Sequence, residues 1–175
     1  TVAWQLYDQL TPEVGLQYLK NMNFTGIVKD DYTLATSLGG FTKGVSPLEM
    51  AAGFATIEND GMYREPTCIK TIIDSDENVV YASQMTEVSI YEQDAARMMT
   101  DVLTTVMDSG TGRALKLKGM PCAGKTGTTN DHKDGWFVGF TRYYTTSVWV
   151  GCDYPKAIQS LSGSTYPGRI WNAYM

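Results

Sequence analysis

Apolar residues recur at helical intervals near the start of the chain. Val2, Leu6 and Leu10 fall on one face of a helix predicted over residues 2 to 10. Thr11-Pro12-Glu13 then offers a hydroxyl acceptor, a proline for the first turn and an early acid, which together predict a second helix. We expect both helices to be scaffold. The second would pack through Val14, Leu16, Tyr18 and Leu19.

Two more helices are predicted by the capping-box pattern, a serine followed three residues later by glutamate. The pattern occurs at Ser46-Pro47-Leu48-Glu49, after a glycine-rich turn over residues 38–45, and again at Ser89-Ile90-Tyr91-Glu92. A methionine-rich stripe at helical spacing is typical of a face that packs in a core. The predicted inner positions are Met50, Phe54 and Ile57 in the first helix, and Ala95, Met98, Met99, Val102, Leu103, Val106 and Met107 in the second.

The period changes to that of strands in two regions. Residues 67–81 predict a hairpin around the polar turn Asp74–Asn78, which lacks the glycine and distal glutamate of an EF-hand calcium loop. Residues 136–141 and 145–152 predict a second antiparallel hairpin. With the segment just before them they would form a three-stranded meander. A loop over residues 160–168 and a terminal helix from Arg169 are expected to follow.

Composition is that of an ordinary globular protein. The 175 residues are 43% hydrophobic and 19% charged, enough for a single domain with a core. A formal net charge of −5 argues against nucleic acid or an anionic membrane surface as the main partner. The three cysteines lack C-x-x-C spacing and the only histidine, His132, lies in a polar loop. We therefore expect free, mostly buried thiols, no metal site and no cofactor.

Candidate chemistry is concentrated in Lys125-Thr126-Gly127-Thr128-Thr129. On an extended backbone, Lys125, Gly127 and Thr129 point to one side and Thr126 and Thr128 to the other. Two hydroxyls on one face are suited to holding a carboxylate, and a glycine between them lets a substrate backbone lie close. This arrangement suits an acyl-transfer enzyme beside its nucleophile.

A nucleotide-binding alternative has to be weighed against this interpretation. Residues 119–126 match the phosphate-binding pattern G-x-x-x-x-G-K-T letter for letter. That pattern requires a buried strand before it and a helix that begins at the lysine. Here Leu115-Lys116-Leu117-Lys118 precedes it, and glycine with hydroxyl and amide residues follows it. A P-loop is therefore only a remote alternative.

Several motifs together resemble the penicillin-binding transpeptidases, which share their fold with the serine β-lactamases. The third signature of that superfamily, K-T-G, is present at residues 125–127. Its surroundings are similar to the bifunctional class A penicillin-binding proteins, and the likeness covers nearly the whole chain. The similar segments are GVSPLEMA at 44–51, SGTGRA at 109–114, GKTGTTND at 124–131, DGWFVGFT at 134–141 and VWVGCD at 148–153.

The resemblance implies an α/β (α+β) fold with an antiparallel sheet flanked by helices, and it implies site roles. Lys125 would fix the serine of the second motif and raise the local potential. The hydroxyls of Thr126 and Thr128 would hold the carboxylate of a D-Ala-D-Ala peptide or of a β-lactam. The backbone N–H of Thr128 would be an oxyanion donor. Gly127 and Thr129 complete the expected substrate-binding strand. His132, Trp136 and Arg113 are weaker candidates.

The chain departs from the superfamily pattern because it contains neither S-x-x-K nor S-x-N. Thr67-Cys68-Ile69-Lys70 has the first spacing but uses threonine and lies in a predicted strand. In class A relatives the second motif precedes a segment like Thr1-Val2-Ala3-Trp4. We therefore expect residues 1–175 to be the C-terminal part of one transpeptidase domain, with the nucleophile upstream and the piece inactive alone.

The implied parent protein cross-links peptidoglycan stem peptides by serine acyl transfer and is a target of β-lactam antibiotics. The resemblance places it on the extracytoplasmic face of a bacterial membrane, anchored outside this chain, where other cell-wall synthesis proteins are further potential partners. Two alternatives from other classes remain: a non-catalytic binding or scaffold fragment of a cell-wall protein, and a β-lactamase-type hydrolase.

Overall fold

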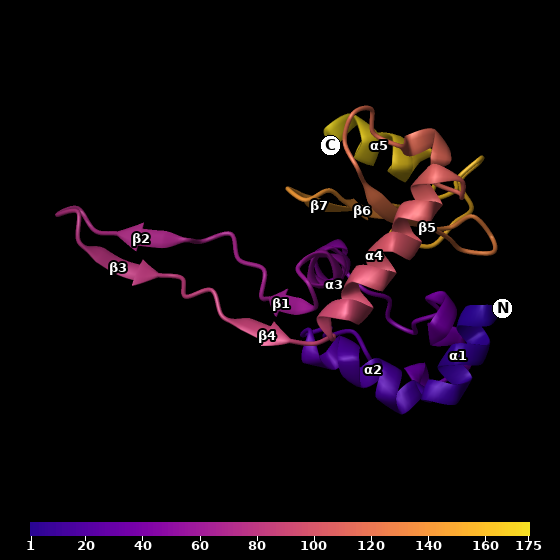
Figure 1. Cartoon of the computed structure of the whole chain (residues 1–175), viewed down its shortest axis with the longest axis horizontal. Coiled ribbons are helices and arrows are strands. Elements are labelled where there is room, and N and C mark those ends of the chain that lie inside the picture. Colours follow the sequence, from indigo (N-terminus) through magenta and orange to yellow (C-terminus); the bar gives the residue numbers. More distant parts are fainter.

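The computed structural model describes residues 1–175 as a helical part, a sheet part and a projecting arm (Figure 1). The long helix α4 runs between the first two parts, and the arm extends away from both. None of the helices combines the length and apolar character that a membrane crossing requires. The helices are α1 (Val2–Leu10), α2 (Pro12–Asn21), α3 (Pro47–Glu58), α4 (Gln93–Asp108) and α5 (Tyr166–Tyr174), with 3-10 turns at Lys29–Asp31, Leu34–Leu38 and Arg113–Leu115.

The first two helices are confirmed, but the predicted cap is not, and the packing predicted for Val14 and Tyr18 was wrong because they are 44% and 38% exposed. Thr11 has a φ of 73° and its side chain makes no capping hydrogen bond. Its backbone instead joins the helices, since its N–H donates to Tyr7 O at 2.9 Å and its carbonyl accepts from Gly15 N at 3.1 Å. Only Leu16 of the two helices is buried, and the face of α1 that carries Val2 is exposed.

Helix α3 has the predicted capping box. Ser46 Oγ accepts from Glu49 N at 3.2 Å, and Glu49 Oε2 accepts from Ser46 N at 2.7 Å. The residues that are fully buried are Ala52, Gly53 and Thr56, while the predicted Met50, Phe54 and Ile57 are half-buried. Small residues therefore make the closest contacts of this helix, and the larger ones surround them.

Two predictions for helix α4 were wrong. Ser89 does not cap it, because Ser89 pairs with Met62 in strand β4 and the helix begins only at Gln93, with Glu92 at the N-cap. The apolar stripe is also only partly core: Leu103 and Met107 are buried, whereas Met98 is 71% exposed. The helix contacts α3 and β5 along one narrow side, so the rest of the stripe faces solvent.

Four short strands form the arm: β1 (Met62–Arg64), β2 (Thr71–Ile73), β3 (Val79–Ala82) and β4 (Glu87–Ser89). The predicted hairpin is confirmed as β2–β3 around the turn at Asp74–Asn78. The β1–β4 pair at the base was not predicted, since three residues are too few for a strand period. Cys68 lies exposed on the arm, so the expectation of mostly buried thiols was wrong for it; Cys122 is buried and Cys152 half-buried.

The predicted meander is confirmed as β5 (Ala123–Thr128), β6 (Gly135–Phe140) and β7 (Thr145–Val150), antiparallel in the order β5-β6-β7. Helix α5 contacts β6 and β7, and its Trp171 ring lies 4.8 Å from that of Phe137, centroid to centroid. Both rings are fully buried, and Trp171 Nε1 donates to Gly139 O at 3.1 Å. Helix α5 begins at Tyr166, three residues earlier than expected, so the predicted loop is shorter.

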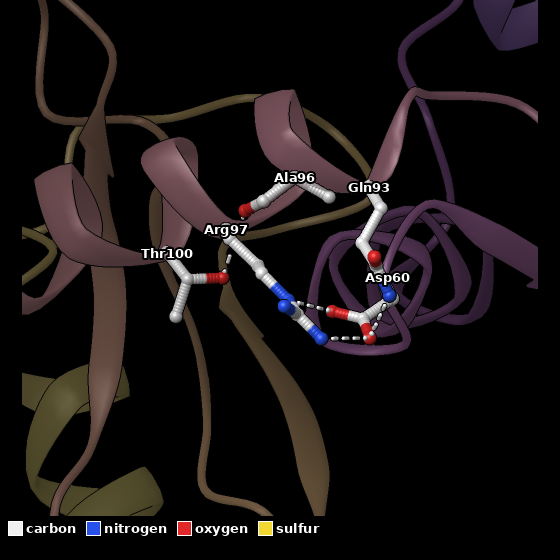
Figure 2. Close-up of polar contacts among 5 residues, drawn as sticks. All are labelled: Asp60, Gln93, Ala96, Arg97 and Thr100. Atoms are coloured by element: carbon white, nitrogen blue, oxygen red, sulfur yellow. Dashed lines mark hydrogen bonds and ion pairs between the residues drawn. The ribbon is translucent and has the colours of Figure 1, made fainter.

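Figure 2 shows how α4 is joined to the turn after α3. The carboxylate of Asp60 accepts from both Arg97 Nε and Arg97 Nη2 at 2.9 Å, and from Gln93 Nε2 at 2.8 Å. These hydrogen bonds hold the pKa of Asp60 below its usual value. Because the pair is exposed, it contributes more to orientation than to stability.

Candidate functional site

Strand β5 carries the lysine motif on an open edge of the sheet. Only β6 pairs with it, in a register that places Lys125 opposite Val138 and Gly127 opposite Trp136. The N–H of Thr129 donates to Asp134 O at 3.1 Å, across to the β6 side. Since N–H groups alternate along a strand, the N–H of Thr128 points to the open edge.

Lys125 is exposed and has no acidic partner in the structure. Its Nζ donates to the carbonyl oxygen of Thr126 at 2.9 Å, which holds the side chain against its own strand. No Asp or Glu lies within ion-pair distance of it, although four other pairs form on the surface. Its charge is therefore available to a ligand or to another residue of the site.

The hydroxyls of Thr126 and Thr128 point away from Lys125, as alternation predicted, and both have partners. Thr126 Oγ1 lies 2.7 Å from Thr111 Oγ1 in the loop after α4. Thr128 Oγ1 accepts from the N–H of Gly163, in the loop before α5, at 3.0 Å. Two segments distant in sequence thus support the hydroxyls of this strand.

Thr129 shapes the turn that follows the strand. Its Oγ1 accepts from Lys133 N at 3.0 Å and from Asp134 N at 2.8 Å. The carboxylate of Asp134 in turn accepts from Trp149 Nε1 at 3.0 Å, and the Trp136 and Trp149 rings lie 6.4 Å apart. The turn is therefore tied to the aromatic surface beside the strand.

A cavity of about 620 Å³ opens beside β5. Lys125 to Thr129 form one wall, Trp136 and Trp149 contribute aromatic surface, and the glycine-rich segment 38–45 with the start of α3 forms the opposite wall. This volume lies in the range of small-molecule sites, with a largely apolar lining and a few polar groups. All five predicted site residues are brought together there.

Buried and half-buried carboxylates hold the opposite wall in place. Asp31 is 1% exposed and accepts from Thr42 N at 2.6 Å and from Val28 N at 2.8 Å. Burial acts to raise the pKa of Asp31, but these hydrogen bonds and the nearby charge of Lys43 together bring it below the usual value. Glu49 accepts from Thr25 N at 2.7 Å and, through its capping box, fixes Ser46 at the end of the same segment.

The structure shows where the three weaker candidates lie, and it excludes the nucleotide alternative. His132 Nδ1 lies 2.7 Å from the carbonyl oxygen of Leu161, which can only accept, so Nδ1 is the donor and the ring joins the turn after β5 to the loop before α5. Trp136 belongs to the cavity wall, whereas Arg113 is exposed in the 3-10 turn after α4. The P-loop alternative is wrong because Lys125 lies within a strand and no helix begins there.

The site also contains residues that sequence reasoning missed as parts of it, namely Thr111, Gly163 and Asp31. Thr111 lies in the motif SGTGRA, which gave no sign of a contact with β5. Gly163 was assigned to a loop, and Asp31 to no role at all. Each of these residues contacts a partner far away in the sequence, and local sequence patterns do not predict such contacts.

Comparison with known proteins places this geometry in a family. Residues 14–175 match the family model for the penicillin-binding protein transpeptidase domain. The chain is 33% identical over 171 residues to penicillin-binding protein 4 of Bacillus subtilis (98% of this chain, 27% of the relative). It is 36% identical over 176 residues to penicillin-binding protein 1F of the same organism (97% and 24%).

The fold has solved counterparts. The structure of PonA1 from Mycobacterium tuberculosis in complex with penicillin V superimposes with a TM-score of 0.84, at 23% identity, over 97% of this chain and 51% of that one. The chain spans about a quarter of the length of the curated relatives it matches. The open-edged strand with its K-T-G sequence, the mixed helical and antiparallel fold and these matches agree, and the chain belongs to the penicillin-binding protein transpeptidase domain family.

Proposed function

We propose that the protein containing this chain is a serine D,D-transpeptidase that cross-links peptidoglycan stem peptides. The observation that carries the proposal is the composition of one open strand edge. Strand β5 combines an unpaired cation, two supported hydroxyls and an outward N–H within four residues, Lys125 to Thr128. A peptide that ends in a carboxylate has the complementary groups.

Each residue has a role in this proposal. The hydroxyls of Thr126 and Thr128 bind the terminal carboxylate of the acyl donor. The N–H of Thr128 is one oxyanion donor, contributing roughly 3 kcal/mol of transition-state stabilisation. Lys125 supplies positive potential and orients the second-motif serine. Gly127 keeps the strand surface flat, and Thr129 fixes the turn that bounds the site.

The reaction requires the serine nucleophile of an S-x-x-K motif, and none of the serines in residues 1–175 has lysine three positions later. We infer that the serine and its lysine partner belong to another part of the same domain. The serine oxygen attacks the donor carbonyl carbon, and the peptide C–N bond breaks. D-Alanine leaves with the proton of the serine hydroxyl. An amine of a neighbouring strand then attacks the serine ester and takes the acyl group, and the proton that the amine loses returns to the serine oxygen.

The proposal extends to partners and location. The PonA1 complex with penicillin V supports β-lactams as ligands of the same site. Acylation by a β-lactam would use the same attack on a carbonyl carbon, with opening of the lactam ring. The relatives are bacterial penicillin-binding proteins, which supports an extracytoplasmic position with a membrane anchor outside residues 1–175.

Labelled-penicillin acylation tests the proposal on the full-length protein. We expect a stable covalent label on the full-length form and none on residues 1–175 alone. Lys125→Ala should remove the label from the full-length form, whereas Lys118→Ala, which changes an exposed lysine outside the cavity, should leave it.

The outcomes separate the alternatives. A folded full-length protein that takes no label would refute the catalytic proposal and favour a binding or scaffold role. Label that forms and is then lost rapidly by hydrolysis would indicate a β-lactamase-type enzyme. Label on residues 1–175 alone would show that the nucleophile lies within them.

A further inference from the structure

Two residues outside β5 control the hydroxyls of the strand. Thr111 contacts the hydroxyl of Thr126 at 2.7 Å, and the N–H of Gly163 donates to Thr128 Oγ1 at 3.0 Å. Thr111 follows α4 and Gly163 precedes α5, so the two approach β5 from different segments. Neither residue contacts the acyl donor directly in the proposed reaction.

The direction of these hydrogen bonds determines what the hydroxyls present to a ligand. Thr128 Oγ1 accepts from a backbone N–H, so its own proton remains available to donate. In the Thr111–Thr126 pair one hydroxyl proton joins the two oxygens, and the other proton remains free. Thr128 therefore presents a hydroxyl proton, and Thr126 presents a second one when Thr111 is the donor in their hydrogen bond; both protons suit an anion and not a cation.

Gly163 reaches Thr128 only because it has no side chain. A Cβ at residue 163 would lie 2.5 Å from Trp136 O, 2.7 Å from Thr126 Cβ and 2.8 Å from Gly127 N. Two of these three atoms are backbone atoms of the sheet, which cannot rotate away. Any larger residue would push the loop off β5 and break the hydrogen bond to Thr128.

The loop that carries Gly163 is rigidly held. Leu161 is fully buried and its carbonyl accepts from His132. Thr165 Oγ1 accepts from Ser162 N at 2.8 Å and lies 3.0 Å from Ser160 O. The position of the Gly163 N–H is thus fixed before any ligand arrives, which reduces the ordering cost on binding.

We propose that Thr111 and Gly163 are positioning residues that aim the hydroxyl protons of Thr126 and Thr128 at the carboxylate of the acyl donor. The inference rests on the proposed transpeptidase function and deepens it, because it assigns the selection of an anionic donor to two residues that do not touch it. Thr111 acts through Thr126, and Gly163 acts through Thr128.

Two double-mutant cycles on the full-length protein test the proposal, with the rate of acylation by benzylpenicillin as the readout. We expect Thr111→Val and Gly163→Ala each to slow acylation about tenfold or more, the usual effect of losing a hydrogen bond that serves a charged group. Thr111→Ser should restore the rate. The control Thr105→Val removes a hydroxyl on the exposed side of α4 and should change nothing.

Coupling distinguishes positioning from general damage. The double variant Thr111→Val/Thr126→Val should be acylated no more slowly than Thr126→Val alone. Likewise, adding Gly163→Ala to Thr128→Val should not lower the acylation rate further. If Gly163→Ala does not fold, as judged by its thermal transition, Thr165→Val replaces it in the cycle because it loosens the same loop.

The inference would be overturned if, in both cycles, the double variant loses acylation rate by the product of the two single losses. It would also be overturned if Thr111→Val and the folded loop variant, Gly163→Ala or Thr165→Val, are acylated at the wild-type rate. A wild-type protein that takes no label would instead refute the transpeptidase proposal itself.

Discussion

The three-stranded sheet and the β2–β3 hairpin at the end of the arm both consist of antiparallel strands with apolar residues, yet only the sheet has a core. In β6 the side chains of Phe137 and Val138 are 0% and 2% exposed. In the β2–β3 hairpin Ile73 and Val80 are 58% and 67% exposed. The difference lies in the helices around the strands: α3, α4 and α5 all pack on the sheet, whereas no helix covers the hairpin.

This difference explains where the candidate site lies. A site needs donors held to within a fraction of an ångström, and a covered sheet supplies that rigidity. The edge of β5 is open, but the rest of the strand rests on a packed core. The hairpin has open edges too, without any packed face behind them. A two-stranded ribbon of this kind is at best marginally stable in water by itself.

The largest effect is expected for Trp171→Ala, which removes the ring that joins α5 to the sheet. The fully buried side chain contacts Phe137, and we expect the free energy of unfolding to fall by about 3–5 kcal/mol. Urea unfolding followed by circular dichroism measures it. Trp4→Ala is the matched control. Because Trp4 is 37% exposed, this substitution should lower the free energy of unfolding much less. If both variants lose the same free energy of unfolding, the contrast between the sheet, which helices cover, and the exposed parts of the chain is wrong.

The sequence predicted the strand that carries Lys125 to Thr128, but it did not predict the residues that contact the hydroxyls of that strand. Lys125 to Thr129 are consecutive, so their alternation and their chemistry could be read directly from the sequence. The contact between Thr128 and Gly163 spans 35 residues, and that between Thr111 and Thr126 spans 15. Such contacts depend on how helices and loops pack, which local periodicity does not describe.

The same limit explains the errors in the fold. Ser89 fits a capping box locally, but pairing with Met62 extends the chain there and moves the start of α4 to Gln93. The stripe on α4 predicted an apolar face correctly and its burial incorrectly. Periodicity shows which face of a helix is apolar; only the neighbouring elements decide how much of that face they cover.

A medium effect is expected for Asp31→Ala, at the wall opposite β5. The substitution leaves the N–H groups of Val28 and Thr42 without their acceptor, and we expect a loss of about 1–3 kcal/mol in the free energy of unfolding. Since segment 38–45 lines the cavity, benzylpenicillin acylation of the full-length protein should slow as well. Denaturant unfolding and the acylation rate give the two readouts, and Asp30→Ala, on the neighbouring exposed residue, is the control.

A small effect is expected from polar substitutions in the arm. Val80→Thr changes a side chain that is 67% exposed and packs in no core, so the free energy of unfolding should change by no more than about 0.5 kcal/mol. Val138→Thr, on the covered sheet, should cost several times as much because it buries a hydroxyl. A comparable loss in both variants would show that the hairpin is covered by another part of the protein.

The smallest effect is expected at the exposed ion pair between Asp60 and Arg97, and it should depend on pH. Hydrogen bonds from Arg97 and Gln93 hold the pKa of Asp60 below its usual value, so the folded state favours the ionised form. A depressed folded pKa gives stabilisation that is fully present above the unfolded value near 4 and is lost as pH falls through the folded value. The melting temperature of wild type should therefore converge on that of Asp60→Asn in acid and exceed it slightly at neutral pH.

Added salt should reduce the difference in melting temperature between the two proteins at neutral pH, because screening weakens exposed ion pairs. A difference that persists unchanged in acid and in high salt would mean that Asp60 acts by shaping the turn after α3 and not by its charge.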